Sequence, residues 1–403
     1  MKIQDSPALF IIILSLVSSY VSYGQINGKP GIYIRQKIVN DSVAEISVTT
    51  TLENLSGKKK IVEIRCGIWD NKEFITRDIR NVKLGTSGAV SVTQDLDFGM
   101  PELWNGHKHP FLYKIILEVI ENGKILAAAY QPLGLRKFGF DKGNRFFLND
   151  KVFPLYGVYF QNKANYPDNQ DRYKQLKRQL ENVCLSGANA VFLPNQLQTD
   201  FAYSLCDSLG LIVWGSFNKN IINENETRNI IDFIRQNYNH PSIFFWSFGS
   251  WTRQDKSPLS PVDTFECEQL EIFTDLINKE DPGRLTFHES DVWWIPYDSI
   301  DGSQNYDRLH WYKARWSEEP VIYIAGKKDT VNQDVLKRIV VYCNLYDPVL
   351  EVNGNIINDR KDGSSEIDFS WENVGLKKGI NKVRVFARRR GKQIEDTWNF
   401  ELR

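Results

Sequence analysis

Apolar and polar residues alternate through the first part of the chain, from residue 26 to about residue 140. A period of two residues is typical of strands that bury one face. Turn-forming stretches such as NDS, LSGKK and ENGK separate the alternating segments. Several short strands with regular turns predict an immunoglobulin-like β-sandwich over residues 26–140. The predicted strands are residues 32–39, 43–54, 59–70, 89–98 and 111–134.

The pattern changes near residue 146, where short apolar runs begin to alternate with segments of helical period. Thr199 or Asp200 is a candidate cap for one helix, and Gly210 is its stop. Alternating strands and helices predict a parallel sheet. A closed barrel of eight such units takes about 250 residues. Residues 146–310 are too few for that, and they predict a truncated TIM-type (β/α) barrel. The predicted strands are 152–160, 188–194, 211–217, 242–250 and 284–290, and the predicted helices are 169–187, 199–210, 226–240 and 263–281.

Two-residue alternation returns over residues 317–403, where NG and RRGK stretches are typical of hairpin turns. This region predicts a C-terminal immunoglobulin-like β-sandwich. The chain is therefore expected to be a multidomain protein of β and α/β classes.

The first 24 residues have the features of a signal peptide. Lys2 precedes the apolar run 8–17, and small residues at Ser22 and Gly24 are typical of a cleavage site before Gln25. The apolar run is too short to span a bilayer. We therefore expect export to the periplasm or beyond, and no membrane span.

Charge and cysteine content exclude several classes. The 50 basic and 50 acidic residues leave no net charge to attract nucleic acid. The five cysteines are scattered without metal-ligand spacing, and no cofactor motif is present. His107 and His109 form a close pair without a third ligand, so no metal site is predicted. The 51 aromatic residues (11 Trp, 17 Tyr and 23 Phe) suit either core packing or sugar binding.

Several stretches, taken in order, resemble glycoside hydrolase family 2, which includes β-galactosidases and β-glucuronidases. They cover nearly all of residues 30–403. The stretches are PELWNGHKHPFLYKIILEV, LGLRKFGFDKGNRFFLNDKVFPLYGV, GANAVFLP, YSLCDSLGLIVW, YNHPSIFFWSFGS, EDPGRLTF, HWYKARWSEEPVIYI and VVYCNLYDPVLEVNG.

The resemblance implies a retaining mechanism, in which two carboxyl groups flank the scissile bond about 5 Å apart. The family's acid/base Glu, and the Asn before it, fall on Trp251 and Ser250. An indole cannot act as a general acid. Trp251 is thus either a stacking platform for a sugar or a ring that plugs the barrel mouth.

The family's nucleophile is also missing. If residues 318–327 are the seventh barrel strand, the Glu position falls on Ile324 or Ala325. If those residues are instead the junction to the last sandwich, barrel strands from about the sixth onward are deleted. The second alignment fits the short barrel better.

Other charged positions of the family pocket are replaced by Tyr156, Phe192 and Ser216. In contrast, residues that carry the family's fold are retained. This pattern favours a scaffold kept without its chemistry. The retained residues are Cys206, Asp207, Gly210, His240, Pro241, Trp246, Ser247 and Gly249.

Other polar residues follow the fifth predicted strand, at the functional face of a barrel. Glu289 and Asp291 are weak candidates for relocated catalytic carboxylates, since residues two apart in an extended segment point to the same side. A polar loop above the strand is the favoured explanation for them. Residues predicted to contact a sugar are Ser250, Trp251, His288, Trp293 and Trp294.

Three readings follow. The chain is an exported, catalytically inactive family member that binds a glycan or a protein partner covering the open barrel. Alternatively, it is an active retaining β-glycosidase that uses Glu289 and Asp291, or a gene fragment without selected function.

Overall fold

The computed structural model describes residues 21–403 except 24, 27–28, 142–144, 161–169, 194–198, 218–222, 249–263, 287–292, 298–305, 328–330, 333–334 and 364. The chain divides into two compact units. The first combines Met1–Pro154 with Phe192–Asp291, and the second combines Leu155–Val191 with Val292–Arg403. Each unit is described separately below.

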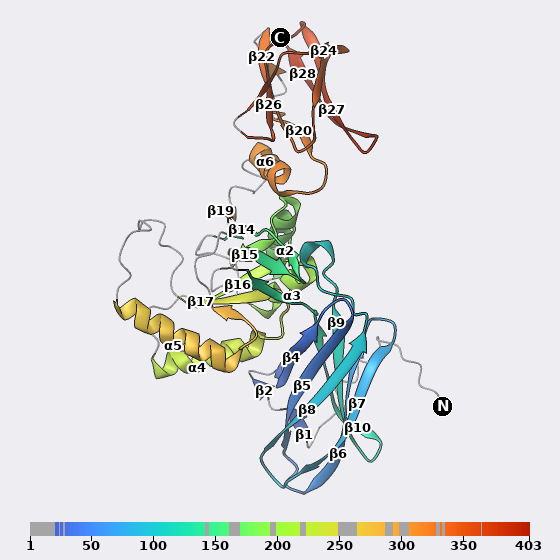
Figure 1. Ribbon diagram of the computed structural model, residues 1–403, viewed down its shortest axis with the longest axis vertical. Coiled ribbons are helices and arrows are strands. Elements are labelled where there is room, and N and C mark those ends of the chain that lie inside the picture. Colours follow the sequence, from blue (N-terminus) through green and yellow to red (C-terminus); the bar gives the residue numbers. More distant parts are fainter. Residues whose placement is uncertain are drawn as a thin grey trace. The chain divides into compact units, whose positions relative to one another are not determined.

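The first unit begins with a two-sheet β-sandwich (Figure 1). In one sheet β5 (Val43–Asn54) pairs with β1 (Val21–Tyr23), β4 (Ile32–Val39) and β8 (Ala89–Gly99). The other sheet has the order β10-β9-β6-β7, with β10 at Lys124–Leu133, β9 at Tyr113–Glu121, β6 at Lys60–Trp69 and β7 at Phe74–Leu84. A short hairpin joins β2 (Gln25–Ile26) to β3 (Lys29–Pro30). Two β-sheets therefore occupy this region, while the bounds 26–140 and the immunoglobulin-like class stay predictions.

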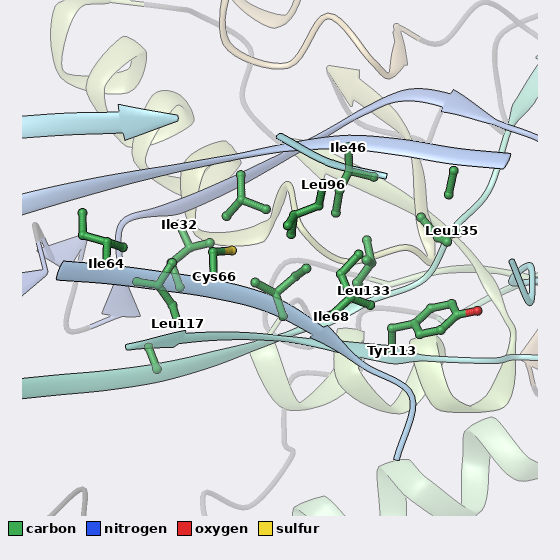
Figure 2. Close-up of a cluster of buried hydrophobic side chains, with 14 of the residues drawn as sticks. Ile32, Ile46, Ile64, Cys66, Ile68, Leu96, Tyr113, Leu117, Leu133 and Leu135 are labelled. Atoms are coloured by element: carbon green, nitrogen blue, oxygen red, sulfur yellow. The ribbon is translucent and has the colours of Figure 1, made fainter. Parts of the chain in front are cut away.

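The core of this sandwich lies between the two sheets. Figure 2 shows side chains such as Ile46 and Leu96 from one sheet facing Ile64 and Leu117 from the other. All four are buried, and they occupy alternate positions of their strands. Burying one such side chain contributes about 1.5–3 kcal/mol. The alternation read from the sequence thus identifies the face that forms the core.

Strand β7 was not predicted. It is an edge strand, hydrogen-bonded to β6 only among the described strands. Most of its residues are exposed or half-buried, including Ile79, which is 53% exposed. Because neither face of β7 carries a continuous apolar row, its sequence lacks the periodic signal that identified its neighbours.

The first unit continues into parallel strands covered by helices. Strand β17 (Ile243–Phe248) pairs in parallel with β16 (Ile212–Phe217) and β18 (Leu285–Thr286). Helices α4 (Glu224–Asn237) and α5 (Thr264–Glu280) lie side by side (Figure 1). The short strands β11 (Phe138–Phe140), β12 (Phe146–Leu148) and β13 (Lys151–Val152) form a separate small sheet. Parallel pairing was predicted for this region.

Helix α3 (Asp200–Leu209) begins and ends where the sequence predicts. The Thr199 hydroxyl accepts a hydrogen bond from Ala202 N at 3.2 Å and caps the helix. Gly210 ends it in the left-handed conformation, with φ of 73°. Of the two candidate caps, Thr199 is the one used.

The second unit contains the first strand of the β/α region. Strand β14 (Tyr156–Tyr159) has β15 (Ala190–Phe192) and β19 (Trp293–Pro296) as neighbours, with β19 parallel to it. Helix α2 (Gln170–Leu185) precedes β15, and α6 (Tyr306–Trp316) follows β19. The sequence did not predict β19 as a strand or α6 as a helix. The prediction of a truncated barrel stays a prediction.

The C-terminal region forms two β-sheets, and the predicted domain bounds 317–403 stay a prediction. One sheet has the order β20-β22-β26-β25, and the other β21-β28-β27-β23-β24. Buried residues including Trp371 and Val385 form its core. The strands are β20 (Ile322–Ile324), β21 (Val331–Asn332), β22 (Leu336–Cys343), β23 (Val349–Val352), β24 (Asn355–Ile357), β25 (Arg360–Asp362), β26 (Asp368–Gly375), β27 (Gly379–Arg389) and β28 (Lys392–Leu402).

Candidate functional site

The predicted sugar-contacting and catalytic residues lie mostly outside the described residues. This holds for Ser250, Trp251, His288, Glu289 and Asp291. Their predicted roles stay predictions.

The two remaining residues of the predicted site lie in β19. The backbone of Trp293 pairs with Tyr156, and that of Trp294 pairs with Gly157. The sequence placed these tryptophans beside the fifth strand, in a polar loop. They instead belong to a strand of their own, which pairs with β14.

The two alignments for the missing nucleophile can be compared directly. Ile324 lies in β20, which pairs antiparallel with β22 of the C-terminal sandwich. Its side chain is fully buried in the core of that sandwich. A barrel strand would be parallel to its neighbours. Residues 322–324 are therefore part of the last sandwich, and the alignment that makes them the seventh barrel strand is wrong.

Tyr156, predicted to replace a basic residue of the family pocket, takes part in packing. Its half-buried ring stacks on Trp316, with centroids 5.6 Å apart and an interplanar angle of 14°. The Trp316 ring in turn lies beside the ring of Tyr312 in the same helix, with centroids 4.7 Å apart. This position therefore packs β14 against α6 within the second unit.

A buried histidine–carboxylate pair joins α3 to the turn before β17. His240 Nδ1 lies 2.6 Å from Asp207 Oδ2, and Ser242 N donates to Asp207 Oδ1 at 3.0 Å. His240 Nε2 lies 3.3 Å from Asp200 Oδ1. Burial lowers the pKa of His240, but Asp207 and Asp200 raise it by more, so it lies above its ordinary value.

The same region makes a close backbone contact. Gly210, which ends α3, lies against Gly106, and a Cβ on Gly210 would come within 2.2 Å of Gly106 C. The indole of Trp104 donates to Asp207 O at 2.9 Å. Asp207, Gly210 and His240, which the sequence analysis identified as fold-bearing, therefore hold α3 against the first sandwich and β17.

Arg284 and Asp281 form a second buried network, at the turn before β18. Arg284 Nη1 is 2.5 Å from Asp281 Oδ2, which also accepts from Trp246 Nε1 at 2.8 Å. Arg284 Nη2 donates to His240 O at 2.8 Å. Both charged side chains are nearly inaccessible to solvent. Trp246, another retained residue, is thus tied to this ion pair.

Arg136 converges on the same point from the linker after the first sandwich. Its Nη2 donates to Ile243 O at 3.1 Å, and Arg284 Nε donates to that same oxygen at 2.6 Å. Its Nε donates to Pro241 O. Burial, followed by the charge of Arg284, lowers the pKa of Arg136 to about 9, which leaves it protonated at neutral pH.

These arginines line a cavity of about 560 Å³ within the first unit. Its walls are β4, the linker 133–138, and the turns that lead into β17 and β18. Asn239, in one of these turns, accepts from Ile34 N at 3.1 Å and donates to Ile32 O at 2.7 Å. The cavity lies at the amino-terminal ends of β17 and β18. In the sequence, the predicted sugar-contacting residues Ser250, Trp251 and His288 instead follow the carboxyl-terminal ends of these strands.

Within the described part of the chain, no group of three or more His, Cys, Asp or Glu residues could hold a metal ion. His109 Nε2 lies 3.0 Å from Glu102 Oε2, and its ring stacks on Phe111. No described helix is long and apolar enough to cross a membrane.

Comparison with known proteins links the chain to glycosidases. Residues 29–136 match the family model of Glycosyl hydrolases family 2. A β-glucuronidase of Bacteroides fragilis is 29% identical over 305 residues, which cover 68% of this chain and 42% of the relative. A β-galactosidase of Bacteroides ovatus is 25% identical over 255 residues, covering 60% of this chain and 30% of the relative. The chain therefore spans less than half the length of these relatives.

Solved structures show the same fold. A β-glucuronidase of Bacteroides uniformis has a TM-score of 0.75 at 16% identity. The match covers 95% of this chain and 62% of that structure. A β-glucuronidase of Parabacteroides merdae has a TM-score of 0.73 at 15% identity. The match covers 95% of this chain and 66% of that structure. These structural matches show a multidomain fold in which β-sandwiches accompany a β/α region. Together, the family model and the named relatives support membership of glycoside hydrolase family 2.

The sequence analysis missed the residues that line the cavity. Arg136 and Arg284 lie in two stretches that carry the family resemblance, LGLRKFGF and EDPGRLTF, but no role was predicted for either. Asn239 immediately precedes the retained His240. A single sequence gives no signal that two arginines, 148 positions apart, meet at one carbonyl oxygen.

Proposed function

We propose that this chain is an exported, catalytically inactive member of glycoside hydrolase family 2 that binds a glycan. Its carbohydrate-related ancestry rests on the family match and on relatives named β-glucuronidase and β-galactosidase. Export rests on the apolar run 8–17, which has the length and flanks of a signal peptide.

Loss of catalysis is supported first by Trp251, which occupies the acid/base position of the family motif. Tryptophan has no proton to give at a useful pKa, so the leaving oxygen would depart unprotonated. Tryptophan at this position thus removes one of the two carboxyl groups that a retaining mechanism needs.

The observation that carries the proposal is the place of β19 in the chain. Strand β19 starts at Trp293, only seven positions after β18 ends at Thr286. One further strand–helix–strand unit takes about 30 residues or more. Strand β19 also pairs with β14, the first strand of the region. In a closed barrel the first strand pairs with the last. We therefore read β19 as the counterpart of the last barrel strand, with the sixth and seventh deleted.

The deletion accounts for the missing nucleophile, and Trp251 separately replaces the acid/base. The family's nucleophile belongs to the seventh strand, which this reading removes. Residues 322–324, the other place where it was sought, lie in the C-terminal sandwich. What remains for ligand binding is the aromatic set after the parallel strands, which includes Trp251 and the paired tryptophans of β19.

Hydrolysis of a panel of aryl β-glycosides, including the galactoside and glucuronide, tests the proposal. The parent is compared with a Glu289→Gln, Asp291→Asn double variant. We expect no turnover from either folded protein. Turnover in the parent that the double variant loses would overturn inactivity and assign relocated carboxylates.

Glycan binding is tested separately, by retention on an array of β-linked glycans. We expect retention that Trp251→Ala weakens. A folded parent that neither hydrolyses nor retains any β-glycan would contradict the binding role.

A further inference from the structure

We propose that the cavity in the first unit binds a small anionic ligand through Arg35, Arg136 and Arg284. The acidic group of the ligand is a carboxylate, sulfate or phosphate. This site is separate from the proposed glycan site and does not depend on it, because it lies at the other end of the parallel strands.

The lining of the cavity has an excess of positive charge. Five basic residues face two carboxylates, in a chain whose total charge is zero. Each carboxylate already has a partner, since Asp150 pairs with Lys137 at 2.7 Å and Asp281 pairs with Arg284 at 2.5 Å. The basic lining residues are Arg35, Lys37, Arg136, Lys137 and Arg284.

Among the described residues, two of these guanidinium groups have no ionic partner. The Arg136 guanidinium donates hydrogen bonds to carbonyl oxygens, and Arg35 makes no ion pair there. Lys37 is held by Asp95 at 2.8 Å, outside the set of lining residues. The unbalanced charge of the cavity is therefore located on Arg35 and Arg136.

The geometry around Ile243 makes this imbalance costly. Arg136 and Arg284 donate to a single neutral oxygen. Among the described residues, Asp281 is the carboxylate that bonds Arg284, and Asp207 acts on Arg136 only through its charge. Like charges held together in a partly buried site repel each other more strongly than they would in water. An anion in the cavity would offset that repulsion and accept charge-assisted hydrogen bonds from the free N–H groups of Arg136.

The cavity also has the size and surface of a ligand site. Its volume of about 560 Å³ falls within the range of about 300–1,000 Å³ that is usual for small-molecule pockets. The rings of Tyr33 and Tyr238 pack edge to face on one wall, with centroids 4.6 Å apart. Gln36 and Asn239 supply amide groups near them. Aromatic rings beside guanidinium groups suit an organic acid as well as an inorganic anion.

The test is thermal unfolding of the full chain with low-millimolar anions, at an ionic strength fixed with sodium chloride. Inorganic sulfate and phosphate are the tetrahedral probes, and acetate and glucuronate are the planar ones. A ligand that binds only the native state raises the midpoint with its concentration. We expect at least one probe to do so, and the responding geometry identifies the acidic group.

Three variants make the test specific. Arg35→Ala removes an exposed arginine and is expected to weaken binding about tenfold or more, as loss of a charge-assisted contact predicts. Arg136→Lys keeps the charge and loses the planar fork, so it should weaken the planar probes most. Arg65→Ala removes a comparably exposed arginine of β6 outside the cavity and should bind as the parent does.

Two results would overturn the proposal. One is a midpoint that responds to every probe no more than to chloride. The other is a response that Arg35→Ala and Arg136→Lys retain in full, which would identify a general salt effect on stability.

Discussion

The Nδ1 atom of His240 and the Oδ2 atom of Asp207 lie 2.6 Å apart, and both side chains are almost completely shielded from water. The second oxygen of Asp207 accepts from Ser242 N. One carboxylate therefore fixes both the histidine ring and the backbone that enters β17.

Asp207→Asn is expected to reduce the free energy of unfolding by about 3–5 kcal/mol, because it leaves a buried ionisable partner uncompensated. Asp200→Asn is the matched control. Its side chain is 57% exposed and contacts the other ring nitrogen of His240 at 3.3 Å. That change should cost less than about 1 kcal/mol. Urea unfolding of both variants gives the two losses of unfolding free energy. Equal losses would contradict the expectation that Asp207 stabilises the fold more than Asp200 does.

The stability of the protein should fall as pH rises through the pKa of His240. Because this pKa is raised in the folded state, the native protein retains the proton at pH values where the unfolded chain has lost it. The stabilisation is fully present below about pH 6.5, the ordinary value for histidine. It is lost as pH increases through the folded value. Unfolding free energies across this window should decline in the parent, and they should decline less in His240→Gln. If the parent instead gained stability relative to His240→Gln as pH rises, the predicted direction of the pKa shift would be wrong.

Gly210→Ala should be among the most damaging single changes in the first unit. It combines a positive φ with a Cβ that would meet Gly106 backbone at 2.2 Å. Left-handed strain of about 1–2 kcal/mol and overpacking of about 1–3 kcal/mol act together. Gly57→Ala has a similar φ of 69° but nothing within 4 Å of the new Cβ. It isolates the strain, and chemical denaturation of the pair separates the two contributions.

The thiols of Cys66, Cys184 and Cys343 should resist modification in the native protein. Burial raises the pKa of Cys66 and of Cys184 to about 12, and that of Cys343 to about 11. At pH 8 the reactive thiolate is therefore scarce. A chromogenic thiol reagent should react slowly with native protein and quickly in denaturant. Ser208→Cys, on an exposed position of α3, provides the fast-reacting control. Rapid labelling of Cys66, Cys184 or Cys343 in the native parent, located by peptide mapping, would contradict this assignment.

Restoring the acid alone should not restore catalysis. Trp251→Glu supplies a carboxyl group at the family's acid/base position, but the nucleophile would still be absent. We expect no turnover of aryl β-glycosides from Trp251→Glu. Its glycan affinity should fall about two- to twelvefold, because an aromatic contact contributes about 0.5–1.5 kcal/mol. Appearance of turnover would show that a second carboxylate is already in place.

Much of the fold was readable because buried faces leave periodic patterns. Strand β5 and helix α3 have the residues expected of them, down to the Thr199 cap. Strand β7 was not predicted because it buries few side chains. Strand β19 was not predicted because four residues are too few to show a period. The two candidate sites differ in another way. The glycan site was read from motif positions, whereas the arginine cavity depends on contacts between turns distant in sequence, which no local pattern encodes.

The side-chain amide of Asn239 also affects how the protein behaves in solution. It bonds to Ile32 and Ile34 of β4 in the way that a neighbouring strand would. Strand β4 lies at an edge of its sheet among the described strands. Exposed edges recruit strands from other molecules and seed aggregation. A single asparagine at the entrance to β17 thus occupies backbone groups that would otherwise pair with another copy of the chain, and it favours a dispersed protein at high concentration.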